Sequence, residues 1–430
     1  MRGTPPNRRA VIVAGLRTPF ARSGTVYRDV TAVRLARHAA RELLYRTELP
    51  GNTVDEVILG QVVPSPLTPN VAREVSLLPQ LPKTIPACTI NRACASGAQA
   101  IANAADQIMA GHADVVVAGG VESLSDIPIL HSKRFAQTLM AASRARTLGE
   151  RAALFAKVRP RDLAPVAPAI AEPSTGESMG QSAERMAKEN GITREAQDRL
   201  ALMSHQRAAA GTADGRLTSE IAPWFGGHDL SEVTTADNGI RLDTSLEALA
   251  QLKPVFDRQH GTVTAGNSSP LTDGAAMTLV MSAEKAYALG YRPLAAVRSY
   301  AVAAVDPGWQ LLSGPAWAVP LALDRAGIAW RDLGLVEIHE AFAAQVLSNV
   351  QAWGSSEWAA RTGRAPLGEV DWERTNVLGG SIAIGHPFGA TGARIVTTLA
   401  NEMVRRDVQF GLLSICAQGG MGFAMVLERV

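Results

Sequence analysis

The stretch CASGAQAIANAADQIMAGHADVVVAGG, residues 94–120, indicates the class of fold. Residues 97–111 are mostly small or apolar and carry Asp106 as their single charge, which predicts a mostly buried helix. The run at 113–120 is short, rich in valine and ends in Gly-Gly, as a strand buried on both faces does. A helix joined directly to a buried strand is the unit of an α/β fold, which is the class we predict.

The same alternation continues on both sides of this stretch. Short β-branched runs predict further strands at 9–15, 54–62, 333–340, 409–417 and 422–430. Helical patterns occupy 31–46, 314–327 and 391–406, and the first and last of these are amphipathic.

The two ends of the chain resemble each other. Each reads helix, strand, Gly- and Ala-rich helix, then a strand ending in Gly-Gly, and an internal duplication explains this better than chance similarity does. We therefore predict two α/β halves with mixed sheets between helices, one formed by 1–125 with 255–290 and the other by 291–430. Residues 126–254 do not fit the repeat and predict an inserted domain of helices and loops.

Composition limits the class of protein. With 47% apolar residues, 19% charged residues and a net charge of +2, the chain is typical of a globular protein with no bias toward nucleic acid. The apolar run at 10–16 is stopped by Arg17, which favours a buried strand over a signal peptide, so we expect a cytoplasmic location. The three cysteines show neither disulfide density nor metal-ligand spacing, and we expect free thiols.

Cys94 lies where the predicted helix begins. Unpaired backbone N–H groups at a helix start favour negative charge, so we expect a lowered pKa and a reactive thiolate at Cys94. The alternative is that Cys94 is simply a small core residue, since free cysteines are commonly buried.

Two histidines and a second cysteine are candidate partners of this thiol. His386 lies in the glycine-rich GGSIAIGHPFGATGAR, and His339 ends a predicted strand directly before Glu340. A histidine suits a cysteine nucleophile as its base because an ordinary imidazole titrates near neutral pH. Cys416 closes another predicted strand before AQGGMG, where a substrate has access to it.

Several motifs together resemble those of the thiolases, which cleave or form 3-ketoacyl-CoA. They are RTPF (17–20), NRACASGAQAI (91–101), GGVES (119–123), GTVTAGNSSPLTDGAA (261–276), HEAFAAQ (339–345), GGSIAIGHPFGATGAR (379–394) and CAQGGMG (416–422), and they span almost the whole chain. Most thiolases carry Asn at the position of His339. The His of HEAF therefore makes this chain resemble one branch more closely, namely the thiolase (beta) subunit of fatty-acid β-oxidation trifunctional complexes.

This resemblance implies a role for each candidate residue. Cys94 would be the nucleophile that takes the acyl group, His386 its base and Cys416 a second acid and base. His339, through a water, would help His386 to stabilise the oxyanion of the thioester. Backbone N–H groups of Cys94 and Gln418 would form a second oxyanion hole, although thiolases commonly have Gly or Ala at the position of Gln418.

The resemblance also implies the ligands and partners. Met179, Ser269 and Phe342 are further candidates for contact with substrate or CoA. Coenzyme A enters as a substrate, and neither a metal nor a redox cofactor is expected. The family implies at least a dimer, and the β-oxidation branch implies a hydratase/dehydrogenase alpha subunit as partner.

Three other functions remain open at this stage. A biosynthetic acetoacetyl-CoA thiolase would share all of these residues. A ketoacyl-synthase-like condensing enzyme uses one cysteine and two histidines but has no role for Cys416. A non-catalytic scaffold subunit would not need the intact cysteines and histidines.

The segment 131–165 is strongly basic. It holds eight Lys or Arg residues against Glu150 and Asp162, with apolar residues at roughly helical spacing. We consider three roles for these predicted amphipathic helices. They are a solvated lid over the site, a surface that docks on anionic membrane or on a partner subunit, and a basic patch that steers CoA phosphates.

Overall fold

The computed structural model describes residues 8–166, 171–226 and 230–430. The first seven residues of the predicted N-terminal half lie outside the described residues, as do 167–170 and 227–229 of the predicted insertion. Strands and helices alternate along most of the described chain, so the predicted α/β class is confirmed.

The first half forms one block of the sheet with its covering helices. In β1, Ala10 and Ile12 face one hydrophobic cluster while Val11 and Val13 face another, as the two-residue period of a strand requires. The elements of this half are β1 (Ala10–Arg17), β2 (Ala21–Arg22), α1 (Ala32–Thr47), η1 (Gly51–Thr53), β3 (Glu56–Gly60), α2 (Val71–Ser76), β4 (Ala87–Ile90), α3 (Ser96–Met109), β5 (Val115–Glu122), β8 (Thr272–Ser282) and α9 (Ala283–Ala288).

The second half repeats this plan. Its elements are β9 (Ala295–Ala304), η4 (Leu311–Ser313), α10 (Gly314–Ala326), η5 (Trp330–Asp332), β10 (Leu335–Ile338), α11 (Ala343–Gly354), α12 (Ser356–Thr362), η6 (Trp372–Arg374), α13 (Ser381–Ile384), α14 (Thr391–Arg405), β11 (Phe410–Ala417) and β12 (Met421–Glu428).

Strand order shows the duplication directly. In the first half β3 pairs in parallel with β5, and β5, β8 and β1 then pair antiparallel in that order. In the second half β10 pairs in parallel with β11, and β11, β12 and β9 follow antiparallel. The two orders are the same, and pairing of β1 with β9 joins them into one 10-stranded sheet. The prediction of two duplicated halves with mixed sheets is confirmed.

Two helices lie between the two blocks. α3 and α14 share a hydrophobic cluster with strands of both halves, whereas α1 and α2 cover the outer face of the first block and α10 and α11 that of the second. The two central helices approach closely, since a Cβ at Gly392 would lie 2.3 Å from the backbone nitrogen of Ala98. The small residues noted in the sequence are therefore needed for this contact.

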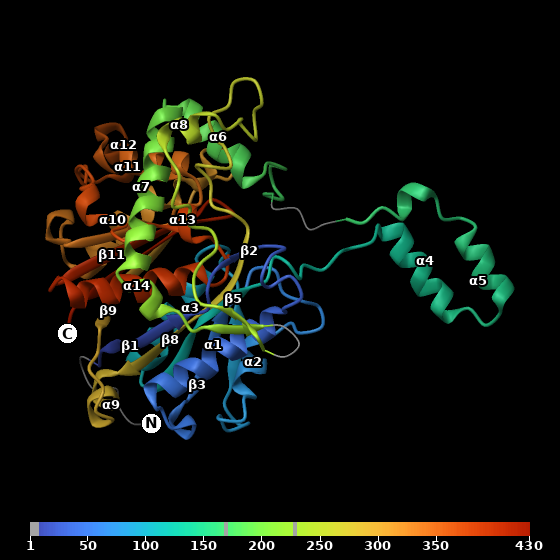
Figure 1. Cartoon of the computed structure of the whole chain (residues 1–430), viewed down its shortest axis with the longest axis horizontal. Coiled ribbons are helices and arrows are strands. Elements are labelled where there is room, and N and C mark those ends of the chain that lie inside the picture. The colour runs from blue at the N-terminus through green and yellow to red at the C-terminus, as the bar shows by residue number, and fades with distance from the viewer. Residues whose placement is uncertain (1–7, 167–170, 227–229) are drawn as a thin grey trace.

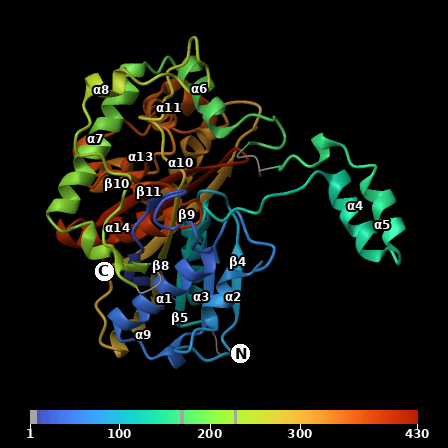
Figure 2. The ribbon, with the colours of Figure 1, turned by 45° about the vertical axis from the view of Figure 1, so that its right-hand side comes forward.

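The segment 126–254 lies outside the repeat and consists of helices, loops and the two short strands β6 and β7. α7 buries Leu200 and Ala201 against the second half, while α4 and α5 stand away from the body of the molecule in both views (Figures 1 and 2). The elements are α4 (Lys133–Arg144), α5 (Leu148–Phe155), η2 (Pro160–Asp162), α6 (Met179–Glu189), α7 (Arg194–Ala213), η3 (Thr218–Glu220), β6 (Trp224–Gly226), β7 (Glu232–Thr234) and α8 (Leu246–Ala250).

Candidate active site

A narrow pocket lies where loops of the two halves meet. Its volume is about 100 Å³, and its lining is mostly apolar. The lining residues are Val62, Ala93, Cys94, Met179, Ser269, Leu271, Leu312, Ala341, Phe342, His386, Phe388, Cys416 and Gln418. None of them comes from 131–165, so that segment does not line the pocket.

Cys94 lies in a strained turn at the start of α3. The preceding Ala93 has a φ of 45°, a left-handed conformation that is uncommon for a residue with a side chain. The Ser96 hydroxyl stabilises this turn by accepting from the Arg92 N–H at 2.8 Å and donating to the Ala93 carbonyl at 2.6 Å. The turn places the Cys94 thiol at the pocket.

The expected lowering of the Cys94 pKa is wrong. Burial raises the pKa of this thiol to about 12, although the backbone N–H groups of Cys94 and Gln418 favour the thiolate. Desolvation of a sulfur anion outweighs these two dipoles. The resting thiol is neutral, so an attack requires a base.

His386 is that base by position. Its backbone N–H donates to the Thr272 hydroxyl at 3.1 Å, and its Nδ1 lies 2.7 Å from the Thr391 hydroxyl. Because Thr391 donates its own proton to the Pro387 carbonyl at 3.0 Å, the Thr391 oxygen accepts from His386 Nδ1–H. The lone pair of the neutral ring is therefore on Nε2, which is buried and has no hydrogen-bond partner among the described residues.

His339 lies beside His386 at the end of β10. The ring centroids are 4.2 Å apart, and Cys94, His339 and His386 each offer a ligand atom within 4.8 Å of the other two. Burial lowers the pKa of both histidines, that of His386 to about 3, and the Arg394 guanidinium lowers both further. Both rings are therefore neutral, and the ordinary imidazole pKa assumed from the sequence does not apply.

Among the described residues, Cys94, His339 and His386 form a group whose ligand atoms lie close enough together to hold a metal ion. Zinc accepts one thiolate and two imidazoles as ligands. The sequence-based expectation that no metal is used stays a prediction.

Cys416 and Gln418 complete the site from the end of β11. Cys416 is buried, and burial together with the neighbouring Cys94 raises its pKa well above the ordinary range. The Gln418 N–H lies against the Cys94 sulfur while its side-chain amide donates to the Ala171 carbonyl at 2.8 Å. The side chain that departs from Gly or Ala therefore turns away and leaves the N–H in place.

A buried carboxyl, that of Glu122, joins two loops of the site. Glu122 accepts from the N–H groups of Val62, Val63 and Gly389 at 2.9 to 3.0 Å, and burial raises its pKa to about 7. The loop after His386 is thereby tied to the loop after β3. Glu122 stands in the GGVES motif, but sequence reasoning gave it no role.

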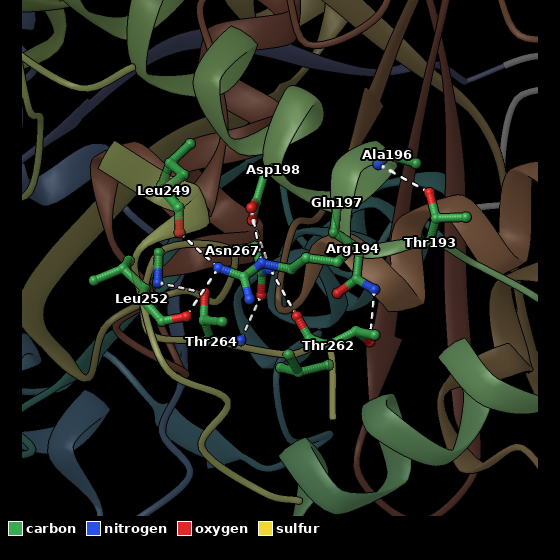
Figure 3. Close-up of polar contacts among 12 residues, drawn as sticks. Thr193, Arg194, Ala196, Gln197, Asp198, Leu249, Leu252, Thr262, Thr264 and Asn267 are labelled. Carbon is green, nitrogen blue, oxygen red and sulfur yellow. Dashed lines mark hydrogen bonds and ion pairs between the residues drawn. The ribbon is translucent and has the colours of Figure 1, made fainter. Parts of the chain in front are cut away.

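A polar network holds the segment 262–271 against the site (Figure 3). Asp198 of α7 accepts from Arg194 at 2.7 Å and from the Asn267 amide at 2.9 Å. The Asn267 side-chain oxygen accepts from the Thr264 N–H at 2.8 Å. Beyond this network, the Ser269 N–H donates to the Ala341 carbonyl at 2.9 Å. The network therefore positions Ser269 and Leu271 on the pocket wall.

The structure brings all of the sequence-predicted site residues together. Met179, Ser269 and Phe342 line the pocket with Cys94, His386, Cys416 and Gln418, and His339 lies behind them against His386. Sequence reasoning missed Val62, Leu271, Leu312 and Phe388. Phe388 stands inside a quoted motif next to Pro387 and was within reach of that reasoning, whereas Leu312 carried no signal.

Comparison with known families identifies the fold. The thiolase N-terminal domain matches residues 10–284, and the thiolase C-terminal domain matches residues 291–429. The chain belongs to the thiolase family. Residues of both matched domains line its pocket.

Named relatives of this thiolase cover nearly its whole length. It is 49% identical to a 3-ketoacyl-CoA thiolase of Erwinia tasmaniensis, over 99% of this chain and 98% of the relative. It is 50% identical to a 3-ketoacyl-CoA thiolase of Escherichia coli, over 98% and 97%. The crystal structure of an acetyl-CoA acetyltransferase of Bacillus anthracis superposes with a TM-score of 0.83 at 36% identity, covering 98% of this chain and 99% of that one.

Proposed function

We propose that this thiolase cleaves 3-ketoacyl-CoA with free CoA, giving acetyl-CoA and a shortened acyl-CoA, as a step of fatty-acid β-oxidation. The convergence of two thiols and two neutral histidines on one apolar pocket carries the proposal. The relatives that are named 3-ketoacyl-CoA thiolase support the substrate class. Coenzyme A is then a substrate, and the reaction needs no metal and no redox cofactor.

The first half-reaction moves the acyl group to Cys94. Its proton passes to His386 Nε2 as the sulfur attacks the 3-keto carbon, and the N–H groups of Cys94 and Gln418 hold the resulting oxyanion. Collapse breaks the C2–C3 bond, and its electron pair forms the enolate of acetyl-CoA. Cys416 donates its thiol proton to C2, while His339 and the protonated His386 stabilise the enolate oxygen.

The second half-reaction reverses these roles. The incoming CoA thiol gives its proton to the Cys416 thiolate and attacks the acyl-Cys94 carbonyl. The tetrahedral intermediate expels the Cys94 sulfur, which recovers its proton from His386. The first half-reaction leaves an acyl-enzyme, and the second returns every proton and restores the starting enzyme, so the kinetics are ping-pong.

The site also bears on the competing functions. A decarboxylating condensing enzyme needs no proton donor at C2, yet Cys416 lies beside Cys94. A scaffold subunit would not need the Thr391 contact that orients His386. A biosynthetic thiolase runs the same steps backward, so assays in both directions separate it from the degradative enzyme.

Steady-state kinetics test the proposal. The purified chain is expected to consume 3-ketoacyl-CoA and CoA with parallel double-reciprocal lines. Cys94→Ser is expected to abolish thiolysis, because a serine hydroxyl is far less acidic than a thiol. The matched control is Cys88→Ser, a change at a half-buried cysteine of β4 outside the pocket, which is expected to keep activity. Near-normal turnover of Cys94→Ser would exclude Cys94 as the nucleophile.

Cys416→Ser separates the two chemical steps. Transfer of an acyl group from a simple acyl-CoA to Cys94 needs no proton at C2 and is expected to persist. Cleavage of the C–C bond is expected to fall steeply, because the proton donor is lost. Equal loss of both reactions would contradict this division of labour.

We also propose that two copies associate across β4. This strand is the last one on its side of the sheet and, among the described strands, pairs only with β3. An unpaired edge carries free N–H and C=O groups that a second chain satisfies. Sedimentation equilibrium is expected to give twice the mass of one chain, and a monomer mass would contradict the proposal.

The arm formed by α4 and α5 is proposed to rest on an anionic membrane. A bridge between Leu130 and Val166 closes its base, and Met140 and Leu148 are 58% and 82% exposed. Exposed apolar residues on a helical arm with a local charge of +6 are typical of an interfacial segment. No described helix is long and apolar enough to cross a membrane.

Co-sedimentation with anionic vesicles tests the arm. Salt-sensitive binding is expected for the wild type and is expected to be lost when Arg144, Arg146, Arg151 and Lys157 become Gln. The control changes four exposed basic residues of the body to Gln, namely Lys83, Lys253, Arg258 and Arg292. If no vesicles bind and the variant instead fails to bind a hydratase/dehydrogenase alpha subunit, the arm docks a partner. If only the KM for CoA rises, the arm steers CoA.

A further inference from the structure

The Ser381 hydroxyl lies between His339 and a buried arginine. His339 Nδ1 is 3.0 Å from the Ser381 oxygen, and Arg394 Nη2 donates to the same oxygen at 3.2 Å. Ser381 and His339 are fully buried, and Arg394 is nearly so. Glu337 also lies near Arg394, with 3.9 Å between Arg394 Nη1 and Glu337 Oε2.

The Ser381 hydroxyl has one hydrogen-bond acceptor within reach among the described residues. A guanidinium only donates, so the Ser381 oxygen accepts from Arg394. In the described part of the chain, His339 Nδ1 is the acceptor within reach of the Ser381 O–H. If His339 Nδ1 carried a proton instead, the buried hydroxyl would be left without an acceptor, at a cost of about 1–3 kcal/mol.

We propose that Ser381 is a positioning residue that holds His339 in the tautomer with its proton on Nε2. His339 then presents a donor to the pocket, whereas Thr391 fixes the neighbouring His386 in the opposite tautomer and leaves it an acceptor. Both Nε2 atoms are buried and have no partner among the described residues, as groups waiting for substrate would be. The two histidines thereby have different roles: His339 is a hydrogen-bond donor, and His386 is a base.

Other residues keep this serine in place. Glu340 accepts from the Ile382 N–H at 3.2 Å, which ties α13 to the end of β10, and from the Ser204 hydroxyl of α7 at 2.7 Å. A Cβ at Gly380 would lie 2.3 Å from the Glu340 carboxyl carbon, so this approach requires glycine. The Arg394 guanidinium also lowers the pKa of both histidines, which keeps the rings neutral and the tautomers meaningful.

The effect of the His339 tautomer on catalysis rests on the proposed thiolysis, whereas the tautomer itself does not depend on that function. Under that function, His339 Nε2–H donates, through a bridging water, toward the enolate oxygen in the transition state. Loss of such a donor lowers kcat more than it changes KM, because the interaction strengthens as the charge develops.

The first test reads the resting wild-type protein. Ring ¹⁵N shifts of ¹⁵N-histidine-labelled protein near pH 7 report which nitrogen carries the proton, and resonances missing in His339→Asn and His386→Asn assign the two rings. His339 is expected to be protonated on Nε2 and His386 on Nδ1. A proton on Nδ1 of His339 would overturn the proposal whether or not the protein shows thiolase activity.

Three variants then test the serine. Ser381→Ala is expected to lose the single His339 tautomer and to lower kcat about 10- to 100-fold, below the ceiling for a lost oxyanion donor, with KM for 3-ketoacyl-CoA changed less than about twofold. Ser381→Thr keeps the hydroxyl and is expected to restore the tautomer and most of kcat. Ser348→Ala removes a buried α11 hydroxyl that has no described partner, and it controls for packing. An unchanged tautomer and kcat in Ser381→Ala would refute the role of the serine.

Discussion

At the scale of single residues, Cys94 and His386 each carry a pKa shift that favours the neutral form. Burial raises the pKa of the thiol to about 12 and lowers that of the imidazole to about 3. Proton transfer between them in the empty site is therefore unfavourable. The charge separates when a substrate oxygen enters the oxyanion hole and takes up the negative charge. The site is thus protected from unproductive ionisation.

Alkylation of Cys94 tests this resting state. Because the thiolate fraction rises with pH below a raised pKa, the rate with iodoacetamide is expected to increase about tenfold per pH unit across pH 7–9. Mass spectrometry of the Cys94 peptide separates it from Cys88 and Cys416. A plateau at neutral pH would mean a stable thiolate-imidazolium pair.

His339 is tested by the residue that most thiolases have there. His339→Asn keeps an N–H donor and is expected to retain measurable thiolysis. His339→Ala is expected to lose about ten- to a thousand-fold in kcat, reaching at its upper end the loss caused by removing one oxyanion donor. Equal loss in both variants, measured by steady-state kinetics, would mean that His339 acts by proton transfer or charge.

The identity of the site residues was predictable from sequence, but their protonation was not. Cys94, His386 and Cys416 stand in motifs that can be recognised from the sequence alone. The pKa shifts depend on burial and on Arg394 of α14, whose side chain reaches the histidines only in the folded chain. Ser381 and Thr391 stood in a quoted motif, yet only hydrogen-bond geometry gives them a function.

At the scale of elements, the two central helices set the geometry of the site. α3 follows Cys94 and α14 follows His386, so the packing of one helix on the other fixes the distance between nucleophile and base. Glycines make the contact possible at Gly97 and Gly392. A change in this contact therefore affects both stability and catalysis.

Gly392→Ala tests the contact between the central helices. The added methyl would press on the backbone of Ala98, and the free energy of unfolding is expected to fall by about 1–3 kcal/mol, as in other overpacked cores. Chemical denaturation measures the change. The control is Gly149→Ala in α5, where an added Cβ meets nothing within 4 Å, and no loss of stability is expected. Equal stability of both variants would contradict the account of this layer.

Long periodic elements were predictable, and weakly marked strands were not. The helices and buried strands named from the sequence are present with bounds shifted by a few residues. β4 has four residues, half of β9 is alanine, and β8 begins at Thr-Asp-Gly, so none gave a strand signal. Their pairing across the sheet, rather than their own composition, makes them strands.

At the scale of the whole molecule, the duplication brings two different sets of groups to one pocket. The first half supplies Cys94, and the second supplies His339, His386 and Cys416. The segment 262–271 forms one wall of the pocket, and the hydrogen bond from Asn267 to Asp198 holds it against α7. The arm of α4 and α5 lies outside this arrangement. Its direction away from the body was not predictable, because an amphipathic sequence does not reveal which surface its helix contacts.

The central claim is that Cys94 takes the acyl group from a 3-ketoacyl-CoA while Cys416 protonates the departing acetyl-CoA enolate. A single-turnover reaction without free CoA tests it most directly, with acetyl-CoA quantified and the intact protein and its peptides weighed by mass spectrometry. The account predicts about one acetyl-CoA released per functional site, an acyl group on the peptide containing Cys94, and neither product in Cys94→Ser. Release of acetyl-CoA without acylation of Cys94, or an acyl group on another residue, would contradict it.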